Sequence, residues 1–285
     1  MIAGVHTTEV IVMSALTYLP RATALIVGTG LMGQHMARNV SEWLDLEKLV
    51  LADHAEQINV GGEGMALADF AAEVADSRAG ATEVVAETLD VTSEAEVRSL
   101  FERHPGVGYL MHTAGISPQP LTPPEALTRE DVIGACEVNL WGAHNVLKQG
   151  IVTGGFAPRT RGVIILSTSA TVGSEGRASA AYEESKGGLM NLLTLQGRYF
   201  AEEHGLILNG LAPSPLRGPM AAQNPVSAGR LQAVEDVMPL GGLTDPSHIA
   251  GATMFFWANE CWCVGEVLTT DGGYTKHKPI YGGLE

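Results

Sequence analysis

Short apolar runs alternate with amphipathic stretches along most of this 285-residue chain. In the amphipathic stretches apolar residues recur every three or four positions, as at Met36, Val40 and Leu44, which predicts a helix with one apolar face. Seven apolar runs predict strands, at residues 24–27, 48–52, 83–89, 107–111, 163–166, 206–211 and 266–270. Strands that alternate with helices indicate an α/β fold with a doubly wound, mostly parallel sheet, built as a single domain.

Residue types that favour helix ends mark where several of these helices begin and stop. Ser93 and Thr128 each stand three residues before an acidic residue, which is the spacing of a capping box. Asp245, followed by a proline, opens a helix near the C-terminus. Gly205 suits the left-handed end of a long helix that begins at about residue 179. A single helix after Thr128 carries its apolar residues at helical spacing: Val132, Cys136, Leu140 and Leu147.

Composition is that of an ordinary globular protein, with 45% hydrophobic and 17% charged residues. The 17 Lys and Arg against 32 Asp and Glu give a formal net charge of −15. This charge argues against a nucleic acid or an anionic membrane as partner, because both need a basic face. No apolar run reaches the roughly 18 residues of a membrane span, and residues 1–20 lack the positively charged start of a signal peptide. We therefore expect a cytoplasmic protein.

No repeat, low-complexity tract or long linker divides the sequence. We expect an N-terminal extension at residues 1–22, a domain at residues 23–275 with a substrate lid at about residues 214–239, and a C-terminal tail at residues 276–285. The three cysteines form neither a CxxC pair nor an even framework. They are interpreted as small buried hydrophobes rather than metal or redox groups: Cys136, Cys261 and Cys263.

The first predicted strand ends in a glycine-rich loop, Gly28-Thr29-Gly30-Leu31-Met32-Gly33. The pattern GxGxxG is weak by itself, but here it follows an apolar strand and opens a helix, as a dinucleotide-binding loop does. Glycines permit a tight turn and a close approach of the backbone to a pyrophosphate, whose charge is favoured at a helix N-terminus. A tight turn without a ligand is the alternative. The candidate cofactor ligands are Gly28, Gly30, Leu31, Met32 and Gly33.

Acidic residues follow the next two predicted strands. Asp53 lies twenty residues past Gly33 and ends the second strand, where a carboxylate accepts hydrogen bonds from ribose hydroxyls and repels a 2′-phosphate. No Lys or Arg stands in the glycine loop or directly after Asp53, so NAD is favoured over NADP. A solvated acidic residue is the alternative. Asp90-Val91 ends the third strand and is a candidate for the adenine amino group, or Asp90 caps the following helix.

The segment Tyr182-Glu183-Glu184-Ser185-Lys186 places a tyrosine and a lysine on one face of the long helix. Ser169 lies thirteen residues upstream of Tyr182, just past a buried strand, and can meet it at the edge of the sheet. Tyrosine has a pKa of about 10, too high for a base at neutral pH, and a nearby ammonium lowers it. Tyr182 is therefore predicted to act as general acid and base, and Ser169 to hold the substrate oxygen. Two residues on a solvated face are the alternative.

These motifs together resemble the short-chain dehydrogenase/reductase family, in its compact single-domain branch, over about residues 23–274. The resemblance implies a Rossmann fold and a homotetramer or homodimer. It implies that Asn139, in Val138-Asn139-Leu140, is a fourth catalytic residue, whose water links Lys186 to solvent. The alternative for Asn139 is a buried structural amide. The further cofactor contacts that the resemblance implies are Thr113, Ala114, Gly115, Tyr182, Lys186 and Pro213.

The sequence departs from the family pattern in three places. The glycine loop is one residue shorter than the usual TGxxxGxG, which bears on the pyrophosphate contacts. The usual NNAG after the fourth strand is HTAG, so His112 replaces an asparagine, and we interpret it as a buried structural histidine. Pro213-Ser214 replaces Pro-Gly, and Gly218 stands where a threonine often contacts the nicotinamide amide. Asp271-Gly272-Gly273 near the end of the chain agrees with the family.

The sequence thus predicts an NAD-dependent enzyme that interconverts a secondary alcohol and a ketone. The predicted lid carries few charges, which favours a small, fairly apolar substrate over a polar one, although the same residues can simply pack the fold: Leu216, Met220, Val226, Leu231 and Val234. One alternative is an epimerase or dehydratase of the same fold that retains NAD. Another is a regulatory protein that senses a dinucleotide, but such a protein would not need both Tyr182 and Lys186.

Overall fold

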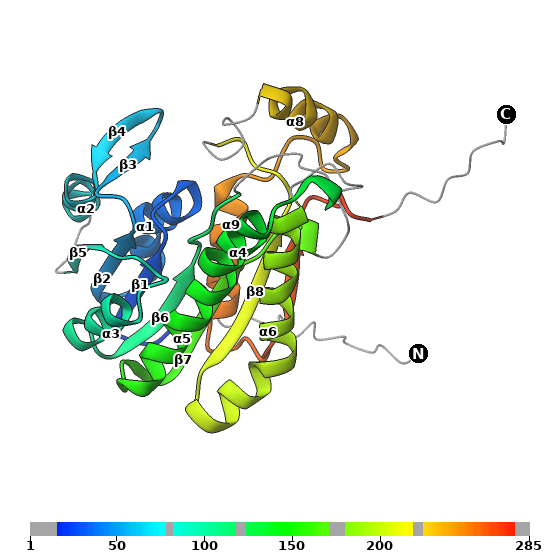
Figure 1. Ribbon diagram of the computed structural model, residues 1–285. Coiled ribbons are helices and arrows are strands. Elements are labelled where there is room, and N and C mark those ends of the chain that lie inside the picture. The colour runs from blue at the N-terminus through cyan, green and yellow to red at the C-terminus, as the bar shows by residue number, and fades with distance from the viewer. Residues whose placement is uncertain (1–15, 78–81, 118–123, 171–179, 219–224, 277–285) are drawn as a thin grey trace, which may run out of the picture.

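The computed structural model describes residues 16–77, 82–117, 124–170, 180–218 and 225–276. Its centre is a seven-stranded parallel sheet in the order β5-β2-β1-β6-β7-β8-β9 (Figure 1). All seven predicted strands are present, so the doubly wound fold is confirmed. The strands are β1 (Ala22–Val27), β2 (Leu46–Asp53), β5 (Glu83–Thr88), β6 (Val107–His112), β7 (Phe156–Ile165), β8 (Ile207–Pro213) and β9 (Val267–Thr270).

Helices cover both faces of the sheet and create two apolar cores (Figure 1). One face carries α1 (Leu31–Trp43), α2 (Leu67–Asp76) and α9 (Pro246–Trp257). The other carries α3 (Glu94–Arg103), α5 (Gly142–Val152) and α6 (Ala180–His204). Helix α4 (Arg129–Cys136) packs on α6, and α8 (Pro225–Val237) lies in the expected lid, of which residues 219–224 are outside the described part. The described part of the chain also contains two short 3-10 turns, η1 (Pro124–Ala126) and η3 (Thr168–Ala170).

The chain order places a switch point between β1 and β6. The chain builds outward through β2 and β5 on one side of β1, then returns to β6 and builds outward on the other side. In open parallel sheets, ligands bind at the carboxyl ends of the strands beside such a point. The glycine loop after β1 and the residues after β6 therefore lie together at the expected place.

The predicted helix ends are confirmed by their hydrogen bonds. The Ser93 side chain accepts from the amide of Glu96, and Thr128 forms a complete capping box. Asp245 caps α9, whose first residue is a proline. Gly205, with a φ of 63°, follows the last residue of α6. These local signals fixed helix boundaries because each cap satisfies amides that have no partner inside the helix.

Two features differ from the sequence-based expectation. A two-stranded hairpin, β3 (Gln57–Val60) and β4 (Glu63–Ala66), stands between β2 and α2 and was not predicted. Its strands are too short for a clear alternation of apolar and polar residues. The helix predicted after Thr128 is present, with helical backbone from Arg129 to Val152, but a π-helical turn, η2 (Glu137–Trp141), interrupts its regular α-helix between α4 and α5. Such turns occur inside α-helices, frequently at functional sites.

The described end of the N-terminal extension packs on the domain. The Thr17 hydroxyl donates to a Glu260 carboxylate oxygen at 2.6 Å, and the Leu19 amide donates to the Tyr109 hydroxyl at 2.5 Å. Residues 1–15 and most of the expected tail, residues 277–285, lie outside the described part. All three cysteines are free, and Cys261 belongs to the core. Among the described residues no helix is long and apolar enough to cross a membrane.

Candidate active site

The glycine loop is shaped by close packing at two glycines and by open space at the third. Gly28 has a φ of 95°, and a Cβ there would lie 2.4 Å from the Ala114 nitrogen. A Cβ on Gly33 would lie 2.1 Å from the Gly28 oxygen, whereas one on Gly30 would meet no atom within 4 Å. Gly30 is also the N-cap of α1 and makes no side-chain cap there. The loop therefore offers an uncapped helix N-terminus beside free space, which fits a pyrophosphate.

The residues after β6 support this loop. The Thr113 hydroxyl donates to the Gly28 carbonyl at 2.7 Å. The amides of Thr113 and Ala114 both donate to the Val27 carbonyl, at 2.7 and 3.0 Å. The structure thus brings two of the expected cofactor residues into contact with the glycine loop, where they fix its backbone.

Asp53 lies at the end of β2, as predicted, and faces the glycine loop. One carboxylate oxygen accepts from the Thr29 amide at 2.6 Å, and the other accepts from the Ala55 amide at 3.0 Å. A carboxylate oxygen has two acceptor sites, so each can take a further hydrogen bond. Asp53 therefore both braces the loop and retains capacity for ribose hydroxyls.

Asp90 and Val91 make local bonds after β5. One Asp90 carboxylate oxygen accepts from both the amide and the hydroxyl of Thr92, at 2.9 and 2.8 Å. The N-cap of α3 is Ser93 rather than Asp90. The Val91 carbonyl accepts from the Asn145 side chain at 2.8 Å. Both residues therefore shape the turn into α3, and their contact with adenine stays a prediction.

Tyr182 and Lys186 share one side of α6. We call their part of the site the chemical end, and the part with the glycine loop and Asp53 is called the nucleotide end. The Lys186 Nζ lies 5.8 Å from the centre of the Tyr182 ring and donates to the Ile165 carbonyl at 2.8 Å. Lys186 is 3% exposed, and burial lowers the pKa of its ammonium to about 8. Burial also raises the pKa of Tyr182, and a hydrogen bond with Ser167 partly offsets this rise. Without a bound cofactor the tyrosine pKa is thus raised, and its lowering in the complex stays a prediction.

The hydroxyl that meets Tyr182 belongs to Ser167, a residue that the sequence reasoning missed. β7 ends at Ile165, and the 3-10 turn at residues 168–170 follows directly. The Ser169 hydroxyl, which was expected at the tyrosine, donates to the Ser167 hydroxyl at 2.8 Å. The only available signal was that Ser167 also follows the buried strand closely. The turn geometry, which spacing cannot give, decides which hydroxyl reaches the phenol.

Asn139 lies in the π-helical turn and is fully buried. Its Oδ1 accepts from the Ile116 amide at 2.7 Å, and its Nδ2 donates to the Ile116 carbonyl at 2.9 Å. Nδ2 also lies 2.9 Å from the hydroxyl of Ser185, which donates to the Tyr182 carbonyl. The amide is therefore tied to the helix that carries Tyr182 and Lys186.

Gly115 lets the asparagine and the lysine approach each other. A Cβ on Gly115 would lie 3.0 Å from the Asn139 Oδ1 and 3.3 Å from the Lys186 Nζ. His112, the last residue of β6, is 1% exposed. Burial, together with the charge of Lys186, lowers the pKa of His112 to about 3, so its imidazole is neutral near pH 7. This agrees with a structural rather than an acid–base role.

The segment after β8 closes on the glycine loop. Pro213 ends β8, and the hydroxyl of the next residue, Ser214, lies 2.6 Å from that of Thr244. A Cβ on Gly218 would lie 2.9 Å from a side-chain carbon of Leu31. Pro213 and Gly218 thus stand on the same edge of the sheet as the glycine loop, as expected for residues near a nicotinamide.

Known proteins match most of the chain. A family model described as enoyl-(acyl carrier protein) reductase matches residues 52–275. Short-chain dehydrogenase reductase 3c of Arabidopsis thaliana is 31% identical over 67% of this chain and 75% of its own length. L-fucose dehydrogenase of Bos taurus is 26% identical over 65% of this chain and 69% of its own length. The crystal structure of a short-chain dehydrogenase/reductase (glucose/ribitol dehydrogenase) from Brucella melitensis aligns with a TM-score of 0.75 and 22% identity, over 91% of this chain and 99% of that one.

Proposed function

The chain belongs to the short-chain dehydrogenase/reductase family, and on that premise we propose that it is an NAD-dependent oxidoreductase that interconverts a secondary alcohol and a ketone. The observation that carries the proposal is the position of Tyr182. Its phenol is hydrogen-bonded to Ser167, and it lies one helical turn from the buried Lys186. It stands at the edge of the sheet that carries the glycine loop. An acid–base group thus lies at the same edge of the sheet as the loop that would hold a dinucleotide.

Tyr182 would accept the proton of the substrate hydroxyl during oxidation and return it during reduction. The bound nicotinamide supplies the hydride chemistry. Ser167 and Ser169 form a pair of hydroxyls that can hold the substrate oxygen, with Ser167 next to the phenol. Lys186 places a positive charge near the phenol, which favours its ionised form. Asn139 would hold the water through which the proton of Lys186 exchanges with solvent.

The preference for NAD is supported by the charges around Asp53. Residues 53–66, which connect β2 with α2, contain Asp53, Glu56 and Glu63 but no Lys or Arg. A 2′-phosphate would meet carboxylates there without a cation to balance it, whereas ribose hydroxyls can donate to them. The glycine loop, with its uncapped helix end, would hold the pyrophosphate.

The direct test is turnover with each cofactor. Secondary alcohols, sugars and ketones are mixed with NAD(H) or NADP(H), and the absorbance of the reduced nicotinamide is followed. L-fucose belongs in the set because a relative is named for it, although the predicted lid favours a less polar substrate. A net change with at least one substrate, faster with NAD(H), supports the proposal. Conversion without net change would indicate an epimerase or dehydratase, and binding without conversion would indicate a sensor.

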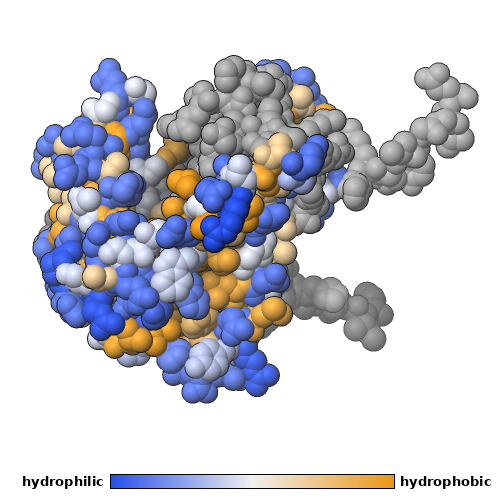
Figure 2. Space-filling view, in the orientation of Figure 1, coloured by the Kyte–Doolittle hydropathy of each residue, from blue (hydrophilic) through white to orange (hydrophobic). Residues whose placement is uncertain are grey.

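We further propose that the enzyme is a homotetramer or homodimer. Apolar side chains interrupt the hydrophilic surface on the face that carries α4, α5 and α6 (Figure 2). Ile133, Val152 and Leu195 are 41%, 57% and 71% exposed on these helices. Exposed apolar side chains on several helices of one face support an interface on that face. Light scattering coupled to gel filtration measures the mass, and a monomer at micromolar concentration would contradict this part of the proposal.

A further inference from the structure

The hairpin β3–β4 stands beside the nucleotide end of the site. It begins four residues after Asp53 and ends where α2 begins. Its Ile58 side chain is 5% exposed and belongs to the core beneath α1 and α2, while the Leu67 amide donates to the Glu56 carbonyl at its base. At the tip, the Gly62 amide donates to the Asn59 side chain at 3.1 Å. The hairpin is therefore anchored to the domain by packing and hydrogen bonds, and it projects from the edge of the sheet (Figure 1).

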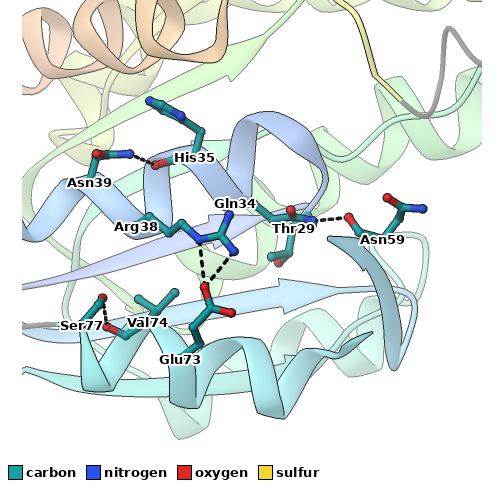
Figure 3. A network of polar contacts seen from close by, with 9 residues as sticks. All are labelled: Thr29, Gln34, His35, Arg38, Asn39, Asn59, Glu73, Val74 and Ser77. Atoms are coloured by element: carbon teal, nitrogen blue, oxygen red, sulfur yellow. Dashed lines mark hydrogen bonds and ion pairs between the residues drawn. The ribbon is translucent and has the colours of Figure 1, made fainter. Parts of the chain in front are cut away.

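One side chain joins this hairpin to the glycine loop. Gln34, in the first turn of α1, is 5% exposed. Its Nε2 donates to the Thr29 carbonyl at 2.9 Å and to the Asn59 carbonyl at 2.8 Å (Figure 3). An amide nitrogen has two hydrogens to donate, so both are used by this bridge. The bridge connects a residue inside the glycine loop with a residue 25 positions after Gln34.

The peptide groups on both sides of Thr29 are thereby held. Asp53 accepts from the Thr29 amide at 2.6 Å, and Gln34 donates to the Thr29 carbonyl. Both hydrogen bonds stabilise this conformation of the loop, and the one to the charged Asp53 carboxylate is the stronger kind. A movement of the glycine loop would therefore strain the hairpin through Gln34, and a ligand that fixes the loop would fix the hairpin too.

We propose that the β3–β4 hairpin is a wall of the adenosine subsite and that Gln34 is the positioning residue that couples it to the glycine loop. The inference rests on the proposed function, since it takes the ligand of the loop to be an adenine dinucleotide. The hairpin and its base carry Glu56 and Glu63, both exposed, and no Lys or Arg. The wall suits a nucleotide whose ribose has free 2′- and 3′-hydroxyls.

The test uses ADP-ribose, which has the adenosine and the pyrophosphate but no nicotinamide, so no turnover is involved. Calorimetry gives its Kd, and hydrogen exchange read by mass spectrometry gives the protection of each segment. In the wild-type protein, ADP-ribose should protect both residues 28–33 and residues 57–66. In Gln34→Met, which keeps the length of the side chain but donates nothing, the Kd should rise about tenfold. Protection should then remain at residues 28–33 and be lost at residues 57–66.

The matched control is Asn39→Ala on the same helix. The Asn39 side chain donates to the His35 carbonyl within α1, at 2.7 Å, so its loss should leave both the Kd and the hairpin protection unchanged (Figure 3). Wild-type protection at residues 28–33 without protection at residues 57–66 would overturn the inference alone, with or without a folded Gln34 variant. So would a Gln34→Met protein with wild-type Kd and protection. No binding of ADP-ribose at all would overturn the proposed cofactor as well.

Discussion

At the chemical end of the site, side chains are buried against one another. Tyr182 and Lys186 lie one turn apart on α6, and the amide of Asn139 is tied to that helix through Ser185. At the nucleotide end, backbone groups form the surface instead, and side chains from separate elements hold them. Asp53 from β2 accepts a hydrogen bond from the Thr29 amide, and Gln34 from α1 donates one to the Thr29 carbonyl. One end thus presents reactive groups, and the other presents a shaped backbone.

This difference determines how each end should respond to substitution. A side chain that reacts can be shortened by one atom while its surroundings stay in place, so the loss should fall on kcat. A side chain that holds a backbone loop changes the loop when it is removed, so the loss should fall on cofactor affinity. Substitutions at the two ends can therefore be told apart by whether kcat or Kd moves.

The largest effect is expected for Tyr182→Phe, which removes only the phenolic oxygen. The kcat should fall by about 10²- to 10⁴-fold, the usual contribution of general acid–base catalysis. The Kd for NAD should stay within about threefold of wild type, because the glycine loop is untouched. Steady-state kinetics and calorimetry on the same preparation measure the two quantities. A kcat near that of the wild type would show that Tyr182 is not the general acid and base.

The pH profile of the wild-type enzyme supplies a companion measurement. Oxidation needs the phenolate, so its rate should rise with pH as the group loses its proton, whereas reduction needs the phenol and should slow. Burial raises the pKa of Tyr182 in the free protein. The group should therefore titrate lower when oxidised cofactor is bound, since a positive ring favours the phenolate. An unchanged apparent pKa would contradict this electrostatic role.

The second effect is a gain in the free energy of unfolding when the buried Lys186 is replaced by an uncharged residue. Burial lowers the pKa of Lys186 from 10.5 to about 8, so between these values the unfolded chain binds a proton that the folded chain does not. The wild-type free energy of unfolding should rise with pH across that window, by about 3 kcal/mol at most. Below about pH 8 the full cost of burying the charge is present.

Lys186→Met removes that cost while filling much of the same space. The variant should be more stable than wild type at about pH 7, and the difference should shrink toward pH 10. Its turnover should be strongly reduced, because the phenol loses its nearest ammonium. Urea unfolding of both proteins at the two pH values gives the comparison, in which other titrating groups cancel. A difference that does not depend on pH would show that burial does not lower the pKa of Lys186.

A third, smaller effect on kcat should distinguish the roles of Ser167 and Ser169. Ser167→Ala removes the hydroxyl that bonds the phenol and should lower kcat about 10- to 100-fold, the range for a hydrogen bond to a charged group. Ser169→Ala removes a donor to Ser167 and should cost less. Kinetics of the two variants on one substrate decide the order. A larger loss for Ser169→Ala would mean that substrate binding turns the hydroxyl pair around.

The chemical end could be predicted from the sequence largely because its spacing is local. Tyr182 and Lys186 are four residues apart on one helix, and a helix fixes where such residues point. At the nucleotide end, the position of Asp53 at the end of β2 could also be predicted, because it follows an apolar run. The choice between Ser167 and Ser169 was not, because it depends on the turn after β7. The π-helical turn at Asn139 left no mark in the apolar spacing either.

The nucleotide end shows the opposite limit. Its glycine motif was recognisable, but the contacts that hold the loop come from residues far apart in the sequence. Gln34 reaches a carbonyl of the hairpin, and Thr113 reaches the Gly28 carbonyl from 85 positions away. A sequence pattern does not indicate which distant residues form such contacts. The hairpin itself consists of two strands of four residues, too short for periodicity to identify.

The smallest expected effect concerns Asp53, which combines a charge with a structural bond. Asp53→Asn removes the negative charge but keeps an oxygen that can accept from the Thr29 amide. The preference for NAD over NADP, measured as the ratio of kcat/KM, should narrow several-fold, while the Kd for NAD changes little. Asp53→Ala removes both the charge and the acceptor, so the same narrowing should come with a weaker Kd, by about tenfold. If both variants weaken NAD equally, the charge rather than the bond to Thr29 holds the loop. If neither narrows the preference, the carboxylate does not face the 2′-position, and discrimination must come from the acidic residues of the hairpin.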